Sequence, residues 1–212
     1  MAGARKPSGN GGRPRRLEPE VERSLLLQSG QRLMRLAGYA GVSVSDVLTD
    51  SGLSTTAFYR HFASKDELLV SIYRENGIEL ARILTRRVES ASNPVEGLEA
   101  WVDEMLRLVF DPRTASHVAI FSDKATAVID AAVAGEILEL QLTPLVAALE
   151  AGRADGSMPG AIPALHARLI SAMVRELTRS HVASEPQLRG RRSTMKALTG
   201  LVLDGIRVRR LT

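Results

Sequence analysis

Apolar residues recur at the spacing of an α-helix from Leu17 almost to the end of the chain. In the first such segment Leu26, Leu33 and Leu36 contribute to one apolar stripe, and Gly38 follows as a natural helix end. Acidic residues near its start suit the positive end of the helix dipole. No segment alternates apolar and polar residues as a half-buried strand would. The pattern predicts an all-α protein.

Two short helices are predicted next. Ser43 opens a capping box, so a helix begins there. Gly52 allows a sharp turn, and Ser54 can cap a second helix that turns Phe58 and Phe62 inward. Two short helices joined by a glycine-containing turn have the geometry of a DNA-binding helix-turn-helix.

Longer helices are predicted beyond this unit. One opens at a second capping box, Ser64 to Glu67, and another at Asn93, where Pro94 occupies the first helical position. The remaining expected elements are a segment around Val118–Phe121 and helices near residues 129–151, 164–181 and 193–210.

Composition narrows the class of protein. The 212 residues include no cysteine, which excludes disulfides, iron–sulfur clusters, thiolate zinc sites and cysteine nucleophiles. No unbroken apolar run reaches the roughly 18 residues of a membrane span, so we expect a cytoplasmic chain with no membrane partner. The four histidines are dispersed, and no hydrolase, metalloprotease or nucleotide-binding motif occurs. We therefore predict no enzyme activity, no catalytic residue, no metal and no cofactor.

Charge is distributed unevenly along the chain. Residues 1–65 hold 10 Lys and Arg against 5 Asp and Glu, whereas residues 66–212 hold 18 against 19. A basic N-terminal third on a near-neutral body is typical of a polyanion-binding module joined to something else. A basic tail without any partner would give the same count.

The second short helix carries side chains suited to DNA. Thr55 and Thr56 are small enough to let a helix approach base edges in the major groove. Tyr59 and His61 can reach phosphate oxygens, as can Lys65 at the start of the next helix. Ordinary surface residues would account for Tyr59 and His61 as well.

The string F-Y-R-H-F-x-S-K-x-E-L-L begins at Phe58 and is preceded by Gly38-Tyr39, Ser43-Val44 and Gly52-Leu53-Ser54. Over roughly residues 21–70 this resembles the N-terminal signature of TetR-family transcriptional regulators. The resemblance implies an all-α homodimer: an N-terminal three-helix helix-turn-helix DNA-binding domain plus a larger C-terminal helical ligand-binding and dimerisation domain. Such proteins bind a palindromic double-stranded DNA operator, usually repress, and are released by a small molecule.

The resemblance also assigns roles to residues. Ser43 and Val44 would cap the first short helix and anchor it at the DNA backbone. Thr55, Thr56 and Ala57 would face bases, while Tyr59, His61 and Lys65 would hold phosphates. Thr55 and Thr56 replace a common Lys-Gly pair, so the operator sequence cannot be taken from relatives.

The N-terminal arm, residues 1–16, is rich in Gly, Pro and Arg and lacks an apolar period. Its segment Gly12-Arg13-Pro14-Arg15-Arg16 contains a G-R-P sequence similar to the centre of AT-hooks, whose arginines enter a narrow minor groove. A solvated tail is the alternative.

The body is expected to dimerise and to bind the effector. The dimerisation candidates are Leu165, Leu169, Met173, Leu177, Leu198, Val202 and Ile206. The core of a monomer would use the same apolar residues. Dimerisation is expected because one helix-turn-helix reads only a half-site of an operator. The candidates for lining a pocket are Trp101, Met105, Phe110, His117, Phe121 and Met173, and most of them would serve equally well as core.

The chain is thus expected to divide into an arm (1–16), a DNA-binding domain (17–65) and a regulatory and dimerisation domain (66–212). We predict a ligand-responsive, homodimeric repressor whose effector is apolar or amphipathic. The alternative is a helical small-molecule-binding protein with weak or lost DNA binding.

Deleting residues 1–16 tests the arm. If its basic residues contact phosphates, the deletion will flatten the dependence of DNA affinity on salt, by about 0.9 in the logarithmic slope for each lost contact. Fluorescence anisotropy at several salt concentrations measures this slope. An unchanged slope would mean that the arm touches no phosphate.

Overall fold

The computed structural model describes residues 17–111, 125, 127–182 and 190–207, and these residues form helices and no strand. The helices are α1 (Pro19–Ala37), the 3-10 helix η1 (Tyr39–Gly41), α2 (Val44–Ser51), α3 (Thr55–His61), α4 (Lys65–Glu89), α5 (Pro94–Phe110), α8 (Ala131–Ala154), α9 (Pro163–Val182) and α10 (Arg191–Arg207). The all-α prediction is confirmed. The expected segment around Val118–Phe121 lies outside the described residues.

The predicted helix starts are confirmed by their caps. The Ser43 hydroxyl accepts the Asp46 N–H at 3.2 Å, and the Asp46 carboxylate accepts the Ser43 N–H at 2.8 Å, which completes the capping box. Ser54, Ser64 and Asn93 each accept an N–H three residues ahead, at 3.2, 3.1 and 2.9 Å. These local bonds satisfy donors that would otherwise lack a partner.

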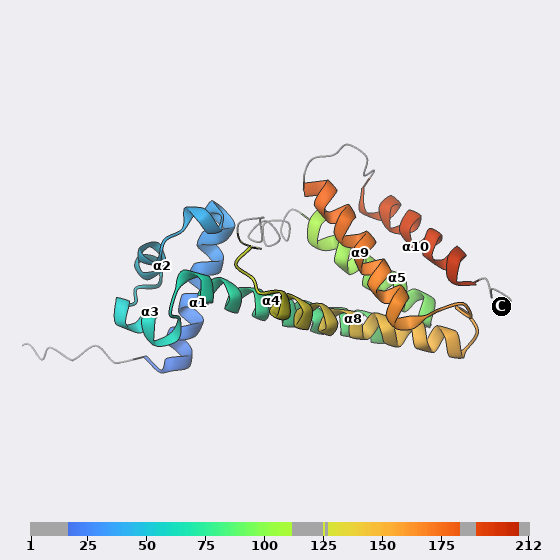
Figure 1. Ribbon diagram of the computed structural model, residues 1–212, viewed down its shortest axis with the longest axis horizontal. Helices are drawn as coiled ribbons and strands as arrows, with labels where there is room; N and C mark the ends of the chain where they lie inside the picture. Colours follow the sequence, from blue (N-terminus) through green and yellow to red (C-terminus); the bar gives the residue numbers. More distant parts are fainter. Residues whose placement is uncertain (1–16, 112–124, 126, 183–189, 208–212) are drawn as a thin grey trace, which may run out of the picture.

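The helices form two groups joined by α4 (Figure 1). Helices α1, α2 and α3 lie at one end of the molecule, and α4 leaves them to run alongside α8. Helices α5, α9 and α10 gather at the other end. The helix-turn-helix is thus held at an extremity, well separated from α10.

Each group has its own hydrophobic core. The smaller core contains Leu26 of α1, Phe58 of α3, Phe62 and, from α4, Leu68 and Ile72. Ala125, from the chain that follows α5, is also buried in it, and Val128 packs against it. The helix-turn-helix therefore depends on residues that lie more than fifty positions downstream.

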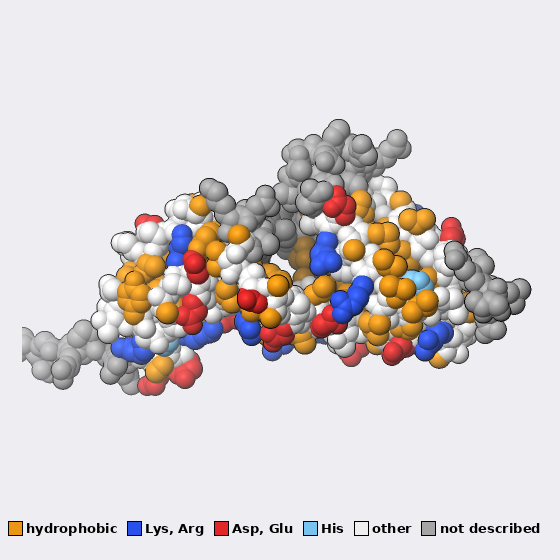
Figure 2. Space-filling view, viewed as in Figure 1, with side chains coloured by type: hydrophobic (Ala, Val, Ile, Leu, Met, Phe, Trp, Pro, Cys, Tyr) orange, Lys and Arg blue, Asp and Glu red, His pale blue; other side chains and the backbone are white. Residues whose placement is uncertain are grey.

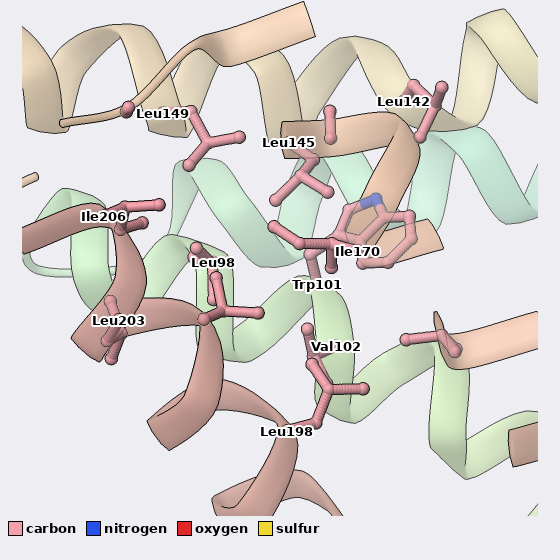
Figure 3. Close-up of a cluster of buried hydrophobic side chains, with 14 of the residues drawn as sticks. Leu98, Trp101, Val102, Leu142, Leu145, Leu149, Ile170, Leu198, Leu203 and Ile206 are labelled. Atoms are coloured by element: carbon pink, nitrogen blue, oxygen red, sulfur yellow. The ribbon is translucent and has the colours of Figure 1, made fainter. Parts of the chain in front are cut away.

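The larger core joins α4, α5, α8, α9 and α10, and Figure 3 labels residues from the last four of these helices. Its centre is Trp101 of α5, whose indole Nε1–H donates to the Gln141 carbonyl at 2.9 Å. Leu145 of α8 and Ile170 of α9 lie beside it, whereas Leu203 of α10 belongs to the same core but lies farther away, near Ile206 (Figure 3). Buried apolar area of this kind dominates folding free energy.

Helix α4 belongs to both cores. Leu68, Leu69 and Ile72 are buried in the smaller core, whereas Leu84 is buried in the larger one. The changeover in packing therefore falls inside α4. The division at residue 65/66 remains a prediction for the domains, and it does not coincide with this change of core.

Part of the dimerisation prediction is corrected by burial. Leu198, Val202 and Ile206 are buried in the larger core of their own chain, so they do not form an exposed stripe. Met173 and Leu177 are half-buried against the same core. A helical stripe marks the face that packs, but it does not say against which helix.

Exposed apolar side chains do occur on the same two helices and just before α9. Leu165 and Leu169 of α9 are half exposed, Ile162 precedes them at 57%, and Leu201 of α10 is 68% exposed. Figure 2 shows apolar side chains gathered over α9 on the visible face of the body. We call Ile162, Leu165, Leu169 and Leu201 the α9–α10 patch.

Helix α8 is, among the described residues, the one helix with the length and composition of a membrane span. No unbroken apolar run marks this segment in the sequence because α8 is interrupted by charged residues such as Glu139, although its mean hydropathy is high. Core helices of folded domains pass the same test. Leu142, Leu145 and Leu149 of α8 are buried in the larger core, and the helix continues through Pro144.

The crossing of α4 and α8 requires a glycine. Gly77 is buried on α4, and a Cβ atom at this position would lie 2.4 Å from Cγ2 of Ile137 on α8. Ile137 is itself buried and β-branched, so its side chain has little freedom to move away. The two helices can approach this closely only because residue 77 has no side chain.

The substitution Gly77→Ala is expected to lower the free energy of unfolding by roughly 1–3 kcal/mol, because it overpacks this crossing. Gly135→Ala on α8 is the matched control, since nothing lies within 4 Å of its Cβ position. It should raise stability by up to about 1 kcal/mol through helix propensity. Urea denaturation measures both, and a gain for Gly77→Ala would contradict the close approach.

Candidate nucleic-acid interface

Helix α3 has one buried and one exposed face. Phe58 is fully buried, and its ring lies 5.8 Å from that of Phe62. Thr55 and Thr56 are exposed at the start of the helix, and Tyr59 is 58% exposed. The structure thus presents two hydroxyls and a phenol together on the outside of the helix-turn-helix.

Ala57 does not belong to that outer face. Its side chain is only 4% exposed, which corrects the prediction that Ala57 faces bases. In a helix, residue 57 lies one position before Phe58 and four before His61, on the side that turns toward α1. The small side chain of Ala57 lets α3 pack closely against α1.

Two basic groups of α3 are tied to one carboxylate of α1. Glu22 is buried, with its oxygen Oε2 accepting from the Arg60 guanidinium and lying 3.1 Å from Nε2 of His61. The hydrogen bond with His61 is the largest cause that holds the pKa of Glu22 below its ordinary value, and Arg60 adds to it against the effect of desolvation. We call these three residues the Glu22 cluster.

The Glu22 cluster corrects the role assigned to His61. The imidazole is 9% exposed and its Nε2 is engaged with Glu22, so it is not placed to hold a phosphate in this structure. Because Glu22 lies 39 residues before His61, no pattern along the sequence indicates their contact. In the sequence, Glu22 is one of several acidic residues near the start of α1, and the helix dipole accounts for all of them without any contact to α3.

Lys65 begins α4 beside the exposed face of α3. Its ammonium donates to the carbonyl oxygens of Tyr39 at 3.0 Å and Val42 at 2.8 Å, and it lies 4.2 Å from the centre of the Tyr39 ring. An ammonium has three N–H donors, so one is left for another acceptor. The lysine is held in a defined position and is half-buried.

Tyr39, which contacts the Lys65 ammonium through its ring and its carbonyl oxygen, is itself held in place by a hydrogen bond. Its hydroxyl donates to the Asp66 carboxylate. Burial and then the neighbouring Asp66 raise the pKa of Tyr39 to about 12, so the phenol stays protonated and keeps donating. In the sequence Tyr39 stands out only as part of a helix end, because its partners lie 26 and 27 residues away.

Ser43 caps the start of α2, as the sequence predicts. Ser43 is exposed, and its hydroxyl also donates to Asp46 at 2.6 Å. This bonding holds the pKa of Asp46 below its usual value. Val44 is half-buried against the smaller core. Contact of these two residues with DNA stays a prediction, and Arg13, Arg15 and Arg16 lie outside the described residues.

Four of the six residues predicted to line an effector pocket lie in the described part of the chain. Trp101 is 1% exposed, and Met105, Phe110 and Met173 pack against the larger core, so a pocket lined by these residues stays a prediction. His117 and Phe121 lie outside the described residues. An open groove of about 430 Å³ lies instead between α4 and α8, and its lining is Ile78, Ala81, Arg82, Thr85, Arg86, Leu140 and Thr143.

Within the described ranges, no group of three or more His, Cys, Asp or Glu side chains is placed to hold a metal ion. The titratable groups near α3 are instead paired with one another, as in the Glu22 cluster. The exposed hydroxyls of α3 and the ammonium of Lys65 are groups that can contact a polyanion.

Comparison with known proteins agrees with this geometry. Residues 26–72 match the family model described as bacterial regulatory proteins, tetR family. The chain is 26% identical over 84 residues to the HTH-type transcriptional regulator LmrA of Bacillus subtilis (strain 168), a match that covers 39% of this chain and 45% of that protein. The chain thus matches less than half of this relative's length.

Solved structures share the fold over nearly the full length. A TetR-family transcriptional regulator from Pectobacterium atrosepticum superposes with a TM-score of 0.73 and 22% identity, covering 92% of this chain and 98% of that one. FadR from Bacillus subtilis, solved in complex with stearoyl-CoA, gives 0.68 and 17%, covering 86% and 98%. At these identities the likeness concerns the fold. The match over residues 26–72, which includes α2, α3 and the start of α4, identifies this part of the chain as similar to the N-terminal domain of the tetR family of bacterial regulatory proteins.

Proposed function

We propose that this chain is a homodimeric DNA-binding repressor that reads a palindromic operator and is released by a small amphipathic effector. The observation that carries the proposal is the exposed face of α3, where Thr55, Thr56 and Tyr59 project from a helix-turn-helix at one end of the molecule. The second helix of such a unit enters the major groove with its N-terminal residues at base edges.

In this proposal α3 divides its contacts by position. Thr55 and Thr56, at the N-terminal end, hydrogen-bond to base edges, where a hydroxyl can donate or accept. Tyr59 and Lys65 bind phosphates and set the register of the helix on the duplex. The ammonium of Lys65 has only one free N–H, so its direction is determined by the Tyr39 and Val42 carbonyls.

Dimerisation follows from the reading of two half-sites. The α9–α10 patch is the apolar surface on the helices that the family uses for pairing, and Leu201 at 68% exposure is its most open member. Burying such a patch against its twofold copy removes apolar area from water. A twofold dimer would present two copies of α3 to a palindromic operator.

The effector class is supported by the groove between α4 and α8. Its lining includes the apolar Ile78, Ala81 and Leu140 and the basic Arg82 and Arg86. Both guanidiniums share the single carboxylate of Glu79, at 3.4 and 3.5 Å, which leaves a positive excess. An apolar chain with an anionic head fits this arrangement, and stearoyl-CoA, found with the Bacillus subtilis FadR, is a molecule of that kind.

Selection from a random pool of duplexes tests the DNA-binding proposal, because the protein itself then chooses the sequence that it binds. The wild-type chain should enrich a palindrome whose half-sites lie about 10 base pairs apart or a multiple of this. Failure to enrich any sequence at low salt would favour the alternative, a helical small-molecule-binding protein that has lost DNA binding.

Lys65→Gln should weaken binding to the selected duplex and to a scrambled one by similar factors, because a phosphate contact carries no sequence information. The logarithmic salt slope should fall by about 0.9 for each protomer. Lys196→Gln, an exposed lysine of α10, is the control and should leave the slope unchanged. Equal slopes for the two variants would remove Lys65 from the interface.

Leu201→Arg should shift the chain from dimer to monomer, because it places a charge in the α9–α10 patch. Leu36→Arg is the matched control, since Leu36 is 81% exposed on α1, far from that patch. Light scattering coupled to gel filtration measures both masses. If Leu201→Arg stays dimeric, the interface lies elsewhere.

A further inference from the structure

Helix α3 is attached to the rest of the molecule on two sides. Phe58 and Phe62 attach it to the smaller core, and the Glu22 cluster attaches it to α1. A seven-residue helix is too short to be stable alone, so its orientation depends on these attachments. The aromatic attachment is apolar and non-directional, whereas the hydrogen bonds to Glu22 are directional.

We propose that Glu22 is the positioning residue of the recognition helix: its carboxylate sets the rotation of α3 and keeps Arg60 and His61 away from DNA phosphates. This inference rests on the proposed DNA-binding function and adds a determinant of its sequence specificity. Glu22 itself lies four residues before the segment matched to the family model, so the match does not assign it.

The geometry of the cluster supports control of rotation. Arg60 and His61 are consecutive, so their side chains leave the helix about 100° apart. Both nevertheless meet at the same atom, Oε2 of Glu22. Two bonds from neighbouring positions to one buried point hold a helix against turning about its own axis. This constraint also fixes the directions in which the side chains of Thr55, Thr56 and Tyr59 point, because they belong to the same rigid helix.

Burial makes the constraint strong. Glu22 is 5% exposed, and a buried carboxylate without partners is costly, so the pairing with Arg60 and His61 is favoured over solvent. The neighbouring cation of α1, Arg23, is directed elsewhere: it pairs with Glu75 at 2.7 Å and lies 5.6 Å from the centre of the Phe62 ring.

Charge supports the second part of the proposal. Arg60 and His61 are the basic residues of α3, and both face Glu22. Over residues 17–65 five Lys and Arg balance five Asp and Glu. A DNA-binding unit with no net charge over residues 17–65 gains little from any phosphate backbone, so its affinity depends on base contacts that only the correct sequence supplies.

The test compares Glu22→Gln with the wild-type chain on two duplexes, the one selected from the random pool and a scrambled one of equal composition. Affinity for the selected duplex should fall by about tenfold or more, because α3 loses its orientation. Affinity for the scrambled duplex should stay equal or rise, because a negative charge is removed and two cations are freed. Loss of folded protein would instead lower both affinities together.

Glu20→Gln is the matched control. Glu20 lies in the same turn of α1 and is exposed, so its substitution removes the same charge without touching α3. It should leave the ratio of the two affinities unchanged. Glu22→Asp keeps the carboxylate on a shorter side chain, and its ratio should fall between those of the wild type and Glu22→Gln. Circular dichroism during heating verifies that each variant is folded.

The outcomes separate this inference from the proposed function. A wild-type chain that enriches no sequence overturns the proposed function and, with it, the role of Glu22. A wild-type chain that binds specifically, with Glu22→Gln and Glu20→Gln showing equal ratios, overturns the inference alone. If Glu22→Gln does not fold, Glu22→Asp carries the test, and a ratio equal to that of the wild type overturns the inference.

Discussion

The packing of one helix, α4, determines the arrangement of this molecule. It is continuous over 25 residues and contributes Leu68 and Ile72 to one core and Leu84 to the other. Between these stretches lies Gly77, where the backbone of α4 approaches Ile137 of α8 more closely than any side chain would permit. Because a helix is stiff along its axis, the helix-turn-helix and the body cannot be placed independently of this crossing.

The candidate interface depends on contacts that lie behind it. The exposed hydroxyls of α3 are presented outward because aromatic residues and the Glu22 cluster hold the opposite side of the helix. Lys65 is directed in the same way by two carbonyl oxygens and the Tyr39 ring. Residues that never reach the nucleic acid therefore decide the geometry of those proposed to do so, a general feature of binding sites built on short elements.

Several features of the fold were predictable because their causes are local. A cap at Ser43, Ser54, Ser64 or Asn93 involves a backbone N–H three residues ahead, so the sequence alone identifies it. The helix-turn-helix and its inward Phe58 and Phe62 follow from the same short-range pattern. The prediction of exposed residues on α3 was less complete, since Ala57 and His61 turned toward α1.

What the sequence by itself determined is the all-α class, the helix starts and the place of the helix-turn-helix, because helix capping and periodicity act within one or two turns. What only the tertiary structure decided is which neighbour each helix face meets. Leu198, Val202 and Ile206 share a stripe whether they pack within the chain or against a copy, and the structure buries them and leaves Leu201 exposed. Glu22 and His61 become partners only because α1 and α3 pack together. The contact energy that joins such residues depends on distance in space, which periodicity along one helix does not encode.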